Sequence, residues 1–140
     1  MTGLLQSMSE PILIVEDEFF IAFEMKSILE RAGYEVRAVA ADLTEALTHA
    51  EQGVAIALVD LHLRDGLTGP EIGARLCSEF GATVVFVTAN PRLLGNGIAG
   101  TVGVISKPAE PEVLLTAVSY AMERRRGREI EAPQCLQCFN

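Results

Sequence analysis

Acidic side chains stand where two apolar segments of the chain end. Glu16 and Asp17 follow one such segment and Asp60 follows another, while Thr88 and Lys107 follow two more. Carboxylates held within ~4 Å of one another repel by about 4 kcal/mol per pair at an effective dielectric constant of about 20, so such a group favours a bound cation. Mg²⁺ suits these residues best, because it takes one or two carboxylates, keeps water ligands and accepts phosphate oxygens. On this basis Asp17 and Asp60 are predicted direct ligands, with Glu16 acting through water.

The same residues could support phosphoryl chemistry at Asp60. Carboxylates form acyl phosphates in covalent catalysis. That reaction needs positioning and neutralisation of oxygen charge, which Mg²⁺, the Lys107 ammonium and the Thr88 hydroxyl can supply. The sequence therefore predicts that Asp60 acts as a nucleophile toward a phosphoryl group.

Strands and helices alternate along the chain. The expected strands cover residues 11–15, 36–39, 55–60, 83–88 and 102–105, and the expected helices cover 18–32, 43–50, 70–80 and 111–126. Strands separated by crossover helices form a parallel sheet, and strands that are apolar throughout are covered on both faces. We expect an α/β, doubly wound, five-stranded sheet of order 2-1-3-4-5, whose acidic strand ends flank the point where strand order reverses.

Two segments are hard to interpret from their residue patterns. In the first predicted helix the apolar positions at helical spacing are Phe20, Phe23, Ile28 and Leu29. Residues 90–100 carry three glycines, so the fourth helix should be short or mobile. The run from Gly95 to Gly100 matches G-x-G-x-x-G, but it precedes a strand rather than following one, which excludes a dinucleotide-binding loop.

Four motifs carry a resemblance to a known family. Residues 12–18, 57–66, 85–89 and 106–108, in this order and spacing, resemble the receiver domain of two-component response regulators. The resemblance covers residues 10–126 and implies the flavodoxin-like receiver fold. It leaves residues 127–140 as a C-terminal tail, with no output domain expected.

The resemblance implies roles for individual residues. Asp60 would accept a phosphoryl group from a sensor histidine kinase or a phosphotransfer protein. Glu16, Asp17 and Asp60 would hold Mg²⁺ together with the backbone carbonyl of His62. The positions that would contact the phosphate and switch the domain are Thr88, Ala89 and Lys107.

One departure from the family pattern affects the expected switch. Receivers usually carry Tyr or Phe three residues before the lysine, and here that position is Val104. The chain is in this respect similar to atypical stand-alone receivers of stress and light signalling. Phosphorylation would then change a partner-binding surface built from the fourth helix, the fifth strand and the fifth helix. The side chains of His62 and Arg64 are expected to have no function.

Composition excludes several classes of function. The chain has 140 residues, a net charge of −8 and 49% hydrophobic residues, which suits one globular domain and opposes nucleic-acid binding. No apolar run approaches the ~18 residues that cross a membrane, and the N-terminus lacks the pattern of a signal peptide, so we expect a cytoplasmic protein. The arginines at 124–128 are interpreted as a solvated helix end. A monomer or a weak dimer fits equally well.

The three cysteines are interpreted as free thiols. Cys77 is expected to pack on a helix face, and Cys135 and Cys138 are expected to lie in a mobile tail rather than in a metal or redox site.

Three functions remain open at this point. The first is a phosphoacceptor switch that signals to a downstream protein, or drains phosphate from a kinase. The second is a phosphatase or phosphotransferase with an aspartyl-phosphate intermediate, which is weakened because related hydrolases carry an acid where His62 stands. The third is a flavodoxin-like cofactor-binding module, which the acids after the first strand oppose electrostatically.

Overall fold

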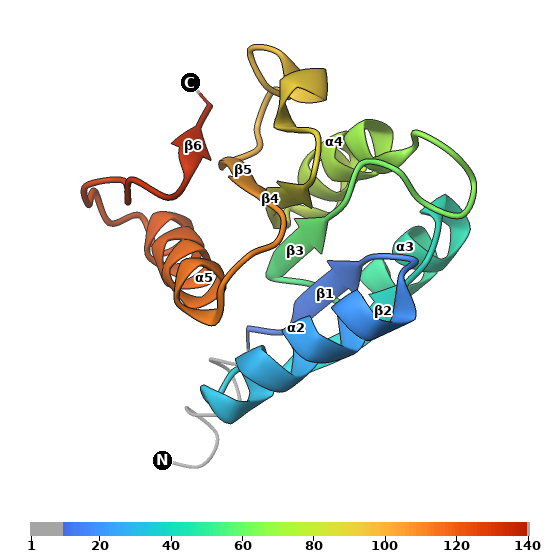
Figure 1. The fold of residues 1–140 in the computed structure, drawn as a ribbon, viewed down its shortest axis with the longest axis horizontal. Helices are drawn as coiled ribbons and strands as arrows, with labels where there is room; N and C mark the ends of the chain where they lie inside the picture. Colours follow the sequence, from blue (N-terminus) through green and yellow to red (C-terminus); the bar gives the residue numbers. More distant parts are fainter. Residues whose placement is uncertain (1–9, 140) are drawn as a thin grey trace.

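The computed structural model describes residues 10–139 and contains a central sheet between two layers of helices (Figure 1). The elements in chain order are β1 (Ile12–Val15), α2 (Phe19–Arg31), β2 (Val36–Ala40), α3 (Leu43–Ala50), β3 (Ile56–Val59), α4 (Gly69–Phe80), β4 (Thr83–Thr88), the 3₁₀ helix η1 (Pro91–Leu94), β5 (Gly103–Ser106), α5 (Pro111–Arg125) and β6 (Gln137–Cys138).

The sheet confirms the predicted topology and extends it. Its order is β2-β1-β3-β4-β5-β6, and the first five strands are parallel. The prediction of five strands was incomplete, because β6 pairs antiparallel with β5. The carboxyl ends of β1 and β3 lie side by side, with Val15 opposite Val59, so the residues that follow these two strands meet at one edge.

Both faces of the sheet are covered, as the apolar strands predict. Ile12 and Ile14 of β1 belong to the core cluster under α2 and α5. Leu13 and Val15, which point to the opposite face because side chains alternate along a strand, belong to the cluster with α3 and α4. All four are fully buried, which gives β1 a rigid position from which Glu16 emerges.

Helix α2 buries a different face from the one predicted. Its buried residues are Ala22, Met25 and Leu29, whereas Phe20 and Phe23 are 77% and 60% exposed. Phe19 is exposed as well, and its ring lies 5.5 Å from that of Phe20 and 6.2 Å from that of Phe23. The prediction that Phe20 and Phe23 mark the apolar stripe was wrong, because the small residue Ala22 and the flexible Met25 fill the space against the sheet.

The fourth helical segment is short, as expected. Only Pro91–Leu94 forms a 3₁₀ turn, and the glycine-rich residues that follow run into β5 without further helix. Leu94 is the buried residue of this turn. The segment therefore adds little packing beside the end of β4.

The C-terminal residues do not behave as the loose tail that was predicted. Residues 137 and 138 form β6 next to β5, and the flanking Leu136 and Phe139 are 5% and 9% exposed. Figure 1 shows this segment returning from α5 to the edge of the sheet. No helix within the described part of the chain has the length and apolarity needed to cross a membrane.

Candidate functional site

Three charged side chains from distant parts of the sequence meet beyond the ends of β1, β3 and β5. The Lys107 ammonium donates a hydrogen bond of 2.7 Å to Oδ2 of Asp60 and also bonds Oε1 of Glu16. These side chains are mostly buried, at 14% exposed for Lys107, 12% for Asp60 and 3% for Glu16. One cation thus bridges two carboxylates in a place with little access to water.

Backbone hydrogen bonds set the position of each member of this cluster. The Asp60 N–H donates to the carbonyl of Val15 at 3.0 Å, which continues the β1–β3 pairing to the acid itself. The Lys107 N–H donates to the carbonyl of Thr88 at 2.9 Å, which does the same for β4 and β5. Because the sheet fixes both main chains, the two side chains need only their own rotamers to meet.

Both acids also accept bonds from nearby backbone amides. Oδ1 of Asp60 accepts from the Leu61 N–H at 2.7 Å, and Oε2 of Glu16 accepts from the Glu18 N–H at 3.1 Å. In each carboxylate, one oxygen therefore accepts a hydrogen bond from a backbone N–H and the other accepts one from the Lys107 ammonium. This arrangement orients the carboxylate planes toward the shared ammonium.

Helix α4 begins against the backbone of Asp60. The Gly69 N–H donates to the carbonyl of Leu61 at 3.0 Å. A Cβ atom at position 69 would lie 2.0 Å from the carbonyl oxygen of Asp60, so only glycine permits this approach. The close packing restricts the loop that follows Asp60 at its far end.

The other predicted site residues lie at the same edge with different exposure. Thr88 is 1% exposed, and its Oγ1 accepts from the Asn90 N–H at 3.0 Å. Ala89, Asp17 and His62 are exposed. Val104, at the position where receivers usually carry an aromatic residue, is buried in β5. The roles of these residues toward Mg²⁺ and phosphate stay predictions.

Burial and ion pairing shift two pKa values within the cluster. Burial raises the pKa of Glu16, and the hydrogen bonds from Lys107 and from the Glu18 N–H offset only part of that effect. Burial lowers the pKa of Lys107, but its hydrogen bonds to Asp60 and Glu16 outweigh this, so the pKa ends above its ordinary value. The ammonium is therefore charged at every physiological pH. Glu16 is the member whose ionisation the site resists.

The donor set fits a hydrated Mg²⁺ ion. Among residues 10–139, no three His, Cys, Asp or Glu side chains converge closely enough to form a metal cage of their own. Mg²⁺ does not need such a cage, because one or two carboxylates, water and phosphate oxygens suffice. Glu16 and Asp60 supply carboxylate oxygens at one point, and Asp17 stands exposed beside Glu16.

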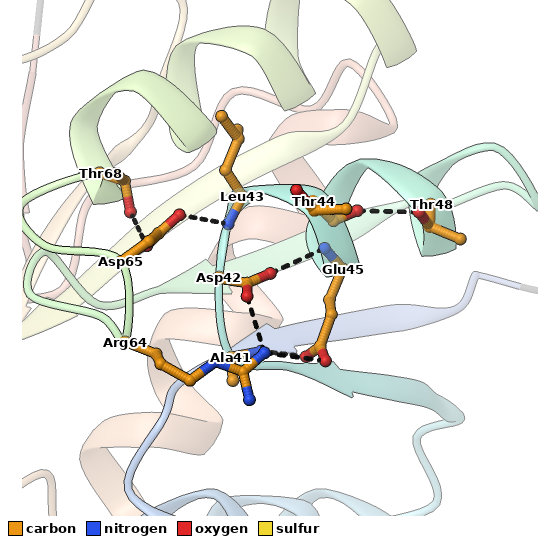
Figure 2. A network of polar contacts seen from close by, with 9 residues as sticks. All are labelled: Ala41, Asp42, Leu43, Thr44, Glu45, Thr48, Arg64, Asp65 and Thr68. Atoms are coloured by element: carbon orange, nitrogen blue, oxygen red, sulfur yellow. Dashed lines mark hydrogen bonds and ion pairs between the residues drawn. The ribbon is translucent and has the colours of Figure 1, made fainter.

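A second polar cluster holds the loop after Asp60 to the start of α3 (Figure 2). Arg64 donates to Oδ2 of Asp42 at 2.7 Å and to Oε2 of Glu45 at 3.0 Å. Asp42 in turn accepts from the Glu45 N–H at 2.9 Å as the N-cap of α3. The Arg64 side chain, for which no function was expected, thus links two loops 22 residues apart.

Asp65 adds a second link between the same loops. Its Oδ2 accepts from the Leu43 N–H at 3.1 Å, and its Oδ1 accepts from the Thr68 hydroxyl at 2.6 Å (Figure 2). The spacing Asp42-x-x-Glu45 is similar to a capping box and is the sequence signal that could have located this cluster. Nothing in the sequence indicated that Arg64 and Asp65 would reach it.

The chain matches the family model described as "Response regulator receiver domain" over residues 12–119. This chain belongs to the receiver domain family. It is 33% identical over 122 residues to the phyllosphere-induced regulator PhyR of Methylorubrum extorquens, with 85% of this chain covered and 46% of the relative. The chain thus spans about half the length of that relative.

Solved receiver domains have the same fold. A CheY-like response regulator receiver domain protein from Methanospirillum hungatei superimposes with a TM-score of 0.74 at 30% identity, covering 84% of this chain and 97% of the other. The PhyR receiver domain of Erythrobacter litoralis gives a TM-score of 0.76 at 24% identity, with 88% and 97% covered. The receiver fold of order 2-1-3-4-5 and a role in two-component signalling follow from this membership, and such domains are generally phosphoacceptor switches rather than enzymes.

Proposed function

We propose that this receiver is a signalling switch that accepts a phosphoryl group on Asp60 with the help of Mg²⁺. The observation that carries the proposal is the 2.7 Å contact between Lys107 Nζ and Asp60 Oδ2, made across 47 residues in a mostly buried site. A buried cation beside one carboxylate is what an acyl phosphate at that carboxylate requires. Membership of the receiver family supports the same assignment.

The phosphoryl transfer from phosphohistidine to Asp60 would be a displacement reaction at phosphorus. A carboxylate oxygen of Asp60 forms a new P–O bond while the P–N bond of a phosphohistidine breaks, and the electron pair remains on the imidazole nitrogen, which then takes up a proton. Lys107 can bond an oxygen of the arriving group, since its ammonium already lies at Asp60. Glu16, Asp17, Asp60 and the carbonyl of His62 would hold Mg²⁺, which when bound neutralises phosphoryl charge.

The residues after β4 would respond to the new charge. A phosphoryl group brings negative charge and three acceptor oxygens. The Thr88 hydroxyl and the exposed Ala89 backbone lie at the edge where those oxygens would arrive. Movement there would shift a pre-existing equilibrium between two arrangements of the segment before β5.

The surface around α2 supports a protein as the phosphoryl donor. Phe19, Phe20 and Phe23 form an exposed aromatic patch that begins two residues after Asp17. Exposed apolar patches of this kind mark protein contacts. We assign this patch to a sensor histidine kinase or a phosphotransfer protein, whose phosphohistidine would thereby reach Asp60.

The output is a protein contact or the withdrawal of phosphate from the kinase. The charge of −8 argues against nucleic acid as the partner, and we place the protein in the cytoplasm with its kinase. The relative in Methylorubrum extorquens is a regulator by name, which supports a regulatory role for this chain. The chain itself would catalyse at most phosphotransfer to Asp60 and its own dephosphorylation.

Intact-mass spectrometry with a small phosphoryl donor tests the proposal. The purified protein is incubated with acetyl phosphate, with Mg²⁺ or with EDTA. The expected result is one added phosphoryl group that requires Mg²⁺ and is lost in Asp60→Asn, which keeps the shape of the side chain. Asp65→Asn, in the same loop, is the matched control and should label like the wild type. Undiminished labelling of Asp60→Asn would reject Asp60 as the acceptor.

A further inference from the structure

The C-terminal strand segment, residues 136–139, occupies the outer edge of β5. Cys138 pairs with Gly103 and Gln137 with Val104, and the Phe139 N–H donates to the carbonyl of Val102 at 2.9 Å. An edge strand exposes unpaired backbone groups that accept another strand. Here residues 136–139 of the same chain cover that edge.

Two glycines make room for this segment. A Cβ atom at Gly103 would lie 2.3 Å from the carbonyl oxygen of Gln137, and one at Gly97 would lie 2.4 Å from the Phe139 ring. The nearest atoms at both positions all belong to the C-terminal strand segment. The glycine-rich run before β5 thus includes part of a shaped receptor for an aromatic side chain.

The segment is also the most weakly held part of the sheet. Its ladder has two residue pairs, whereas the neighbouring pair β4 and β5 has four. The residues that lead to it, 127–135, are exposed except for the half-buried Pro133. Elements with few backbone hydrogen bonds to the rest of the fold open at low free-energy cost.

The C-terminal strand segment contacts β4 and β5, two of the strands whose ends lie at the Asp60 site. The Phe139 ring lies 6.4 Å from the ring of Phe86, two residues before Thr88 on β4. Val104 of β5, which pairs with Gln137, precedes Lys107 by three residues. The register of β4 and β5 places Thr88 opposite Ser106. A displacement of Thr88 or Lys107 toward a phosphoryl group would therefore strain the receptor from two sides. Packed contacts of this kind have two discrete arrangements rather than a graded response.

We propose that the C-terminal strand segment is an intramolecular cover of a strand-addition site on β5, and that phosphorylation of Asp60 releases it. The uncovered edge would then take an extended partner segment that pairs antiparallel with β5 and places an aromatic side chain against Gly97 and Phe86. Strand addition of this type obtains affinity from main-chain hydrogen bonds and specificity from side-chain pockets. The regulatory part of this inference rests on the proposed function of Asp60.

Hydrogen exchange of the full chain tests the release. Exchange of the peptide that contains residues 136–139 is followed by mass spectrometry before and after treatment with acetyl phosphate and Mg²⁺, and the intact mass of the same sample reports phosphorylation. The expected result is at least a roughly tenfold faster exchange of this peptide in the phosphorylated protein, with β1 and β3 unchanged. If the protein is phosphorylated but exchange of residues 136–139 is unchanged, the proposed release of the segment is rejected and the proposed function still stands. A protein that is not phosphorylated would overturn the proposed function, and the release with it.

Glycine substitutions test the cover without phosphorylation. Gly103→Ala and Gly97→Ala should each accelerate the exchange of residues 136–139 by a similar factor in the unphosphorylated protein, and phosphorylation should add little further. Gly95→Ala is the control for Gly97→Ala, because both glycines have a positive φ, of 53° and 106°, but Gly95 has no atom within 4 Å of an added Cβ. Slow exchange in Gly103→Ala, or equal acceleration in Gly95→Ala, would contradict the proposed receptor.

A peptide tests the partner chemistry. A fluorescent peptide Gln-Ser-Leu-Gln-Ser-Phe-Asn, which copies residues 134–140 with serines for the cysteines, is titrated against Phe139→Ala protein, in which the internal competitor is weakened. It should bind this variant at least about tenfold more tightly than it binds the wild type, and a Phe-to-Ala version of the peptide should not bind. Binding that ignores the peptide's phenylalanine, or no binding to Phe139→Ala at any peptide concentration that remains soluble, would overturn the strand-addition site.

Discussion

Lys107 and Arg64 each bridge two carboxylates, and the clusters around these two cations differ mainly in their exposure to water. Lys107 joins Glu16 and Asp60 with side chains that are 14%, 3% and 12% exposed, whereas Arg64 joins Asp42 and Glu45 with side chains that are 58%, 18% and 44% exposed. Water screens the second group and leaves the first with strong mutual interactions. Similar contacts would therefore serve the proposed chemistry in one place and hold loop geometry in the other.

The pKa shifts follow the same division. In the buried cluster desolvation dominates and raises the pKa of Glu16. In the exposed cluster the hydrogen bond from Arg64 dominates and lowers the pKa of Asp42, and the backbone N–H of Ala41 together with Arg64 lowers that of Glu45. The acids of the exposed cluster are stabilised as anions. Burial disfavours the ionised form of Glu16, and the hydrogen bonds from Lys107 and the Glu18 N–H offset part of that cost.

Removal of each cation should produce the largest difference between the two clusters. Lys107→Met is expected to slow phosphorylation by acetyl phosphate by about 100-fold, because it removes the donor aimed at the phosphoryl oxygens. Arg64→Met, the matched change in the exposed cluster, should alter the rate by less than about threefold. Rates come from intact-mass time courses at saturating Mg²⁺. Equal losses in the two variants would mean that the buried cation has no special role.

The two clusters should also respond to pH with opposite signs. Burial holds the pKa of Glu16 above its ordinary value of 4.5, so the folded state binds more protons there, and the stability of wild type relative to Glu16→Gln should fall as pH rises through that raised pKa. The pKa of Asp42 lies below 3.8, so its contribution relative to Asp42→Asn is present above that pH and is lost as pH falls through the lowered pKa. Asn preserves the helix cap.

Urea unfolding between pH 3 and 8 in the presence of EDTA measures both differences. EDTA removes divalent ions that would compensate Glu16. The two curves are the stability differences of wild type from Glu16→Gln and from Asp42→Asn, plotted against pH. If both curves had the same slope, desolvation would not govern the Glu16 cluster while ion pairing governs the Asp42 cluster.

The smallest expected effect concerns the loop that Arg64 and Asp65 hold. Arg64→Ala should raise amide exchange of residues 61–68 by a few-fold at low salt, because exposed ion pairs contribute little. In 1 M salt, where the Debye length is about 3 Å, most of the difference from wild type should disappear. A salt-independent effect would show that Arg64 acts through packing of its side-chain stem instead.

The sheet and the cluster of Glu16, Asp60 and Lys107 could be predicted because regular patterns specify them. The apolar runs before Glu16 and Asp60 determine the strands, and parallel pairing then brings the following residues to one edge. Helix 43–50 and strand 83–88 were predicted with their observed bounds. The meeting of Lys107 with Asp60 follows from strand order together with the polar strand ends.

The remaining features depend on packing that periodicity does not record. β6 has two residues, too few for a period, and its position depends on space left by Gly97 and Gly103. The exposed phenylalanines of α2 match a helical period but point away from the sheet. The link from Arg64 to Asp42 depends on the path of a loop, which sequence spacing alone does not specify.

Chemical trapping of the acceptor is the most direct test of the central claim. Borohydride reduces an aspartyl phosphate to homoserine, and peptide mass spectrometry of protein treated with acetyl phosphate and Mg²⁺ then identifies the residue that carried the phosphoryl group. If Asp60 is the acceptor and Lys107 assists it, homoserine appears at position 60 in the wild type and is almost absent in Lys107→Met. Homoserine at Asp17 or Asp65, or undiminished trapping at Asp60 without Lys107, would contradict that claim.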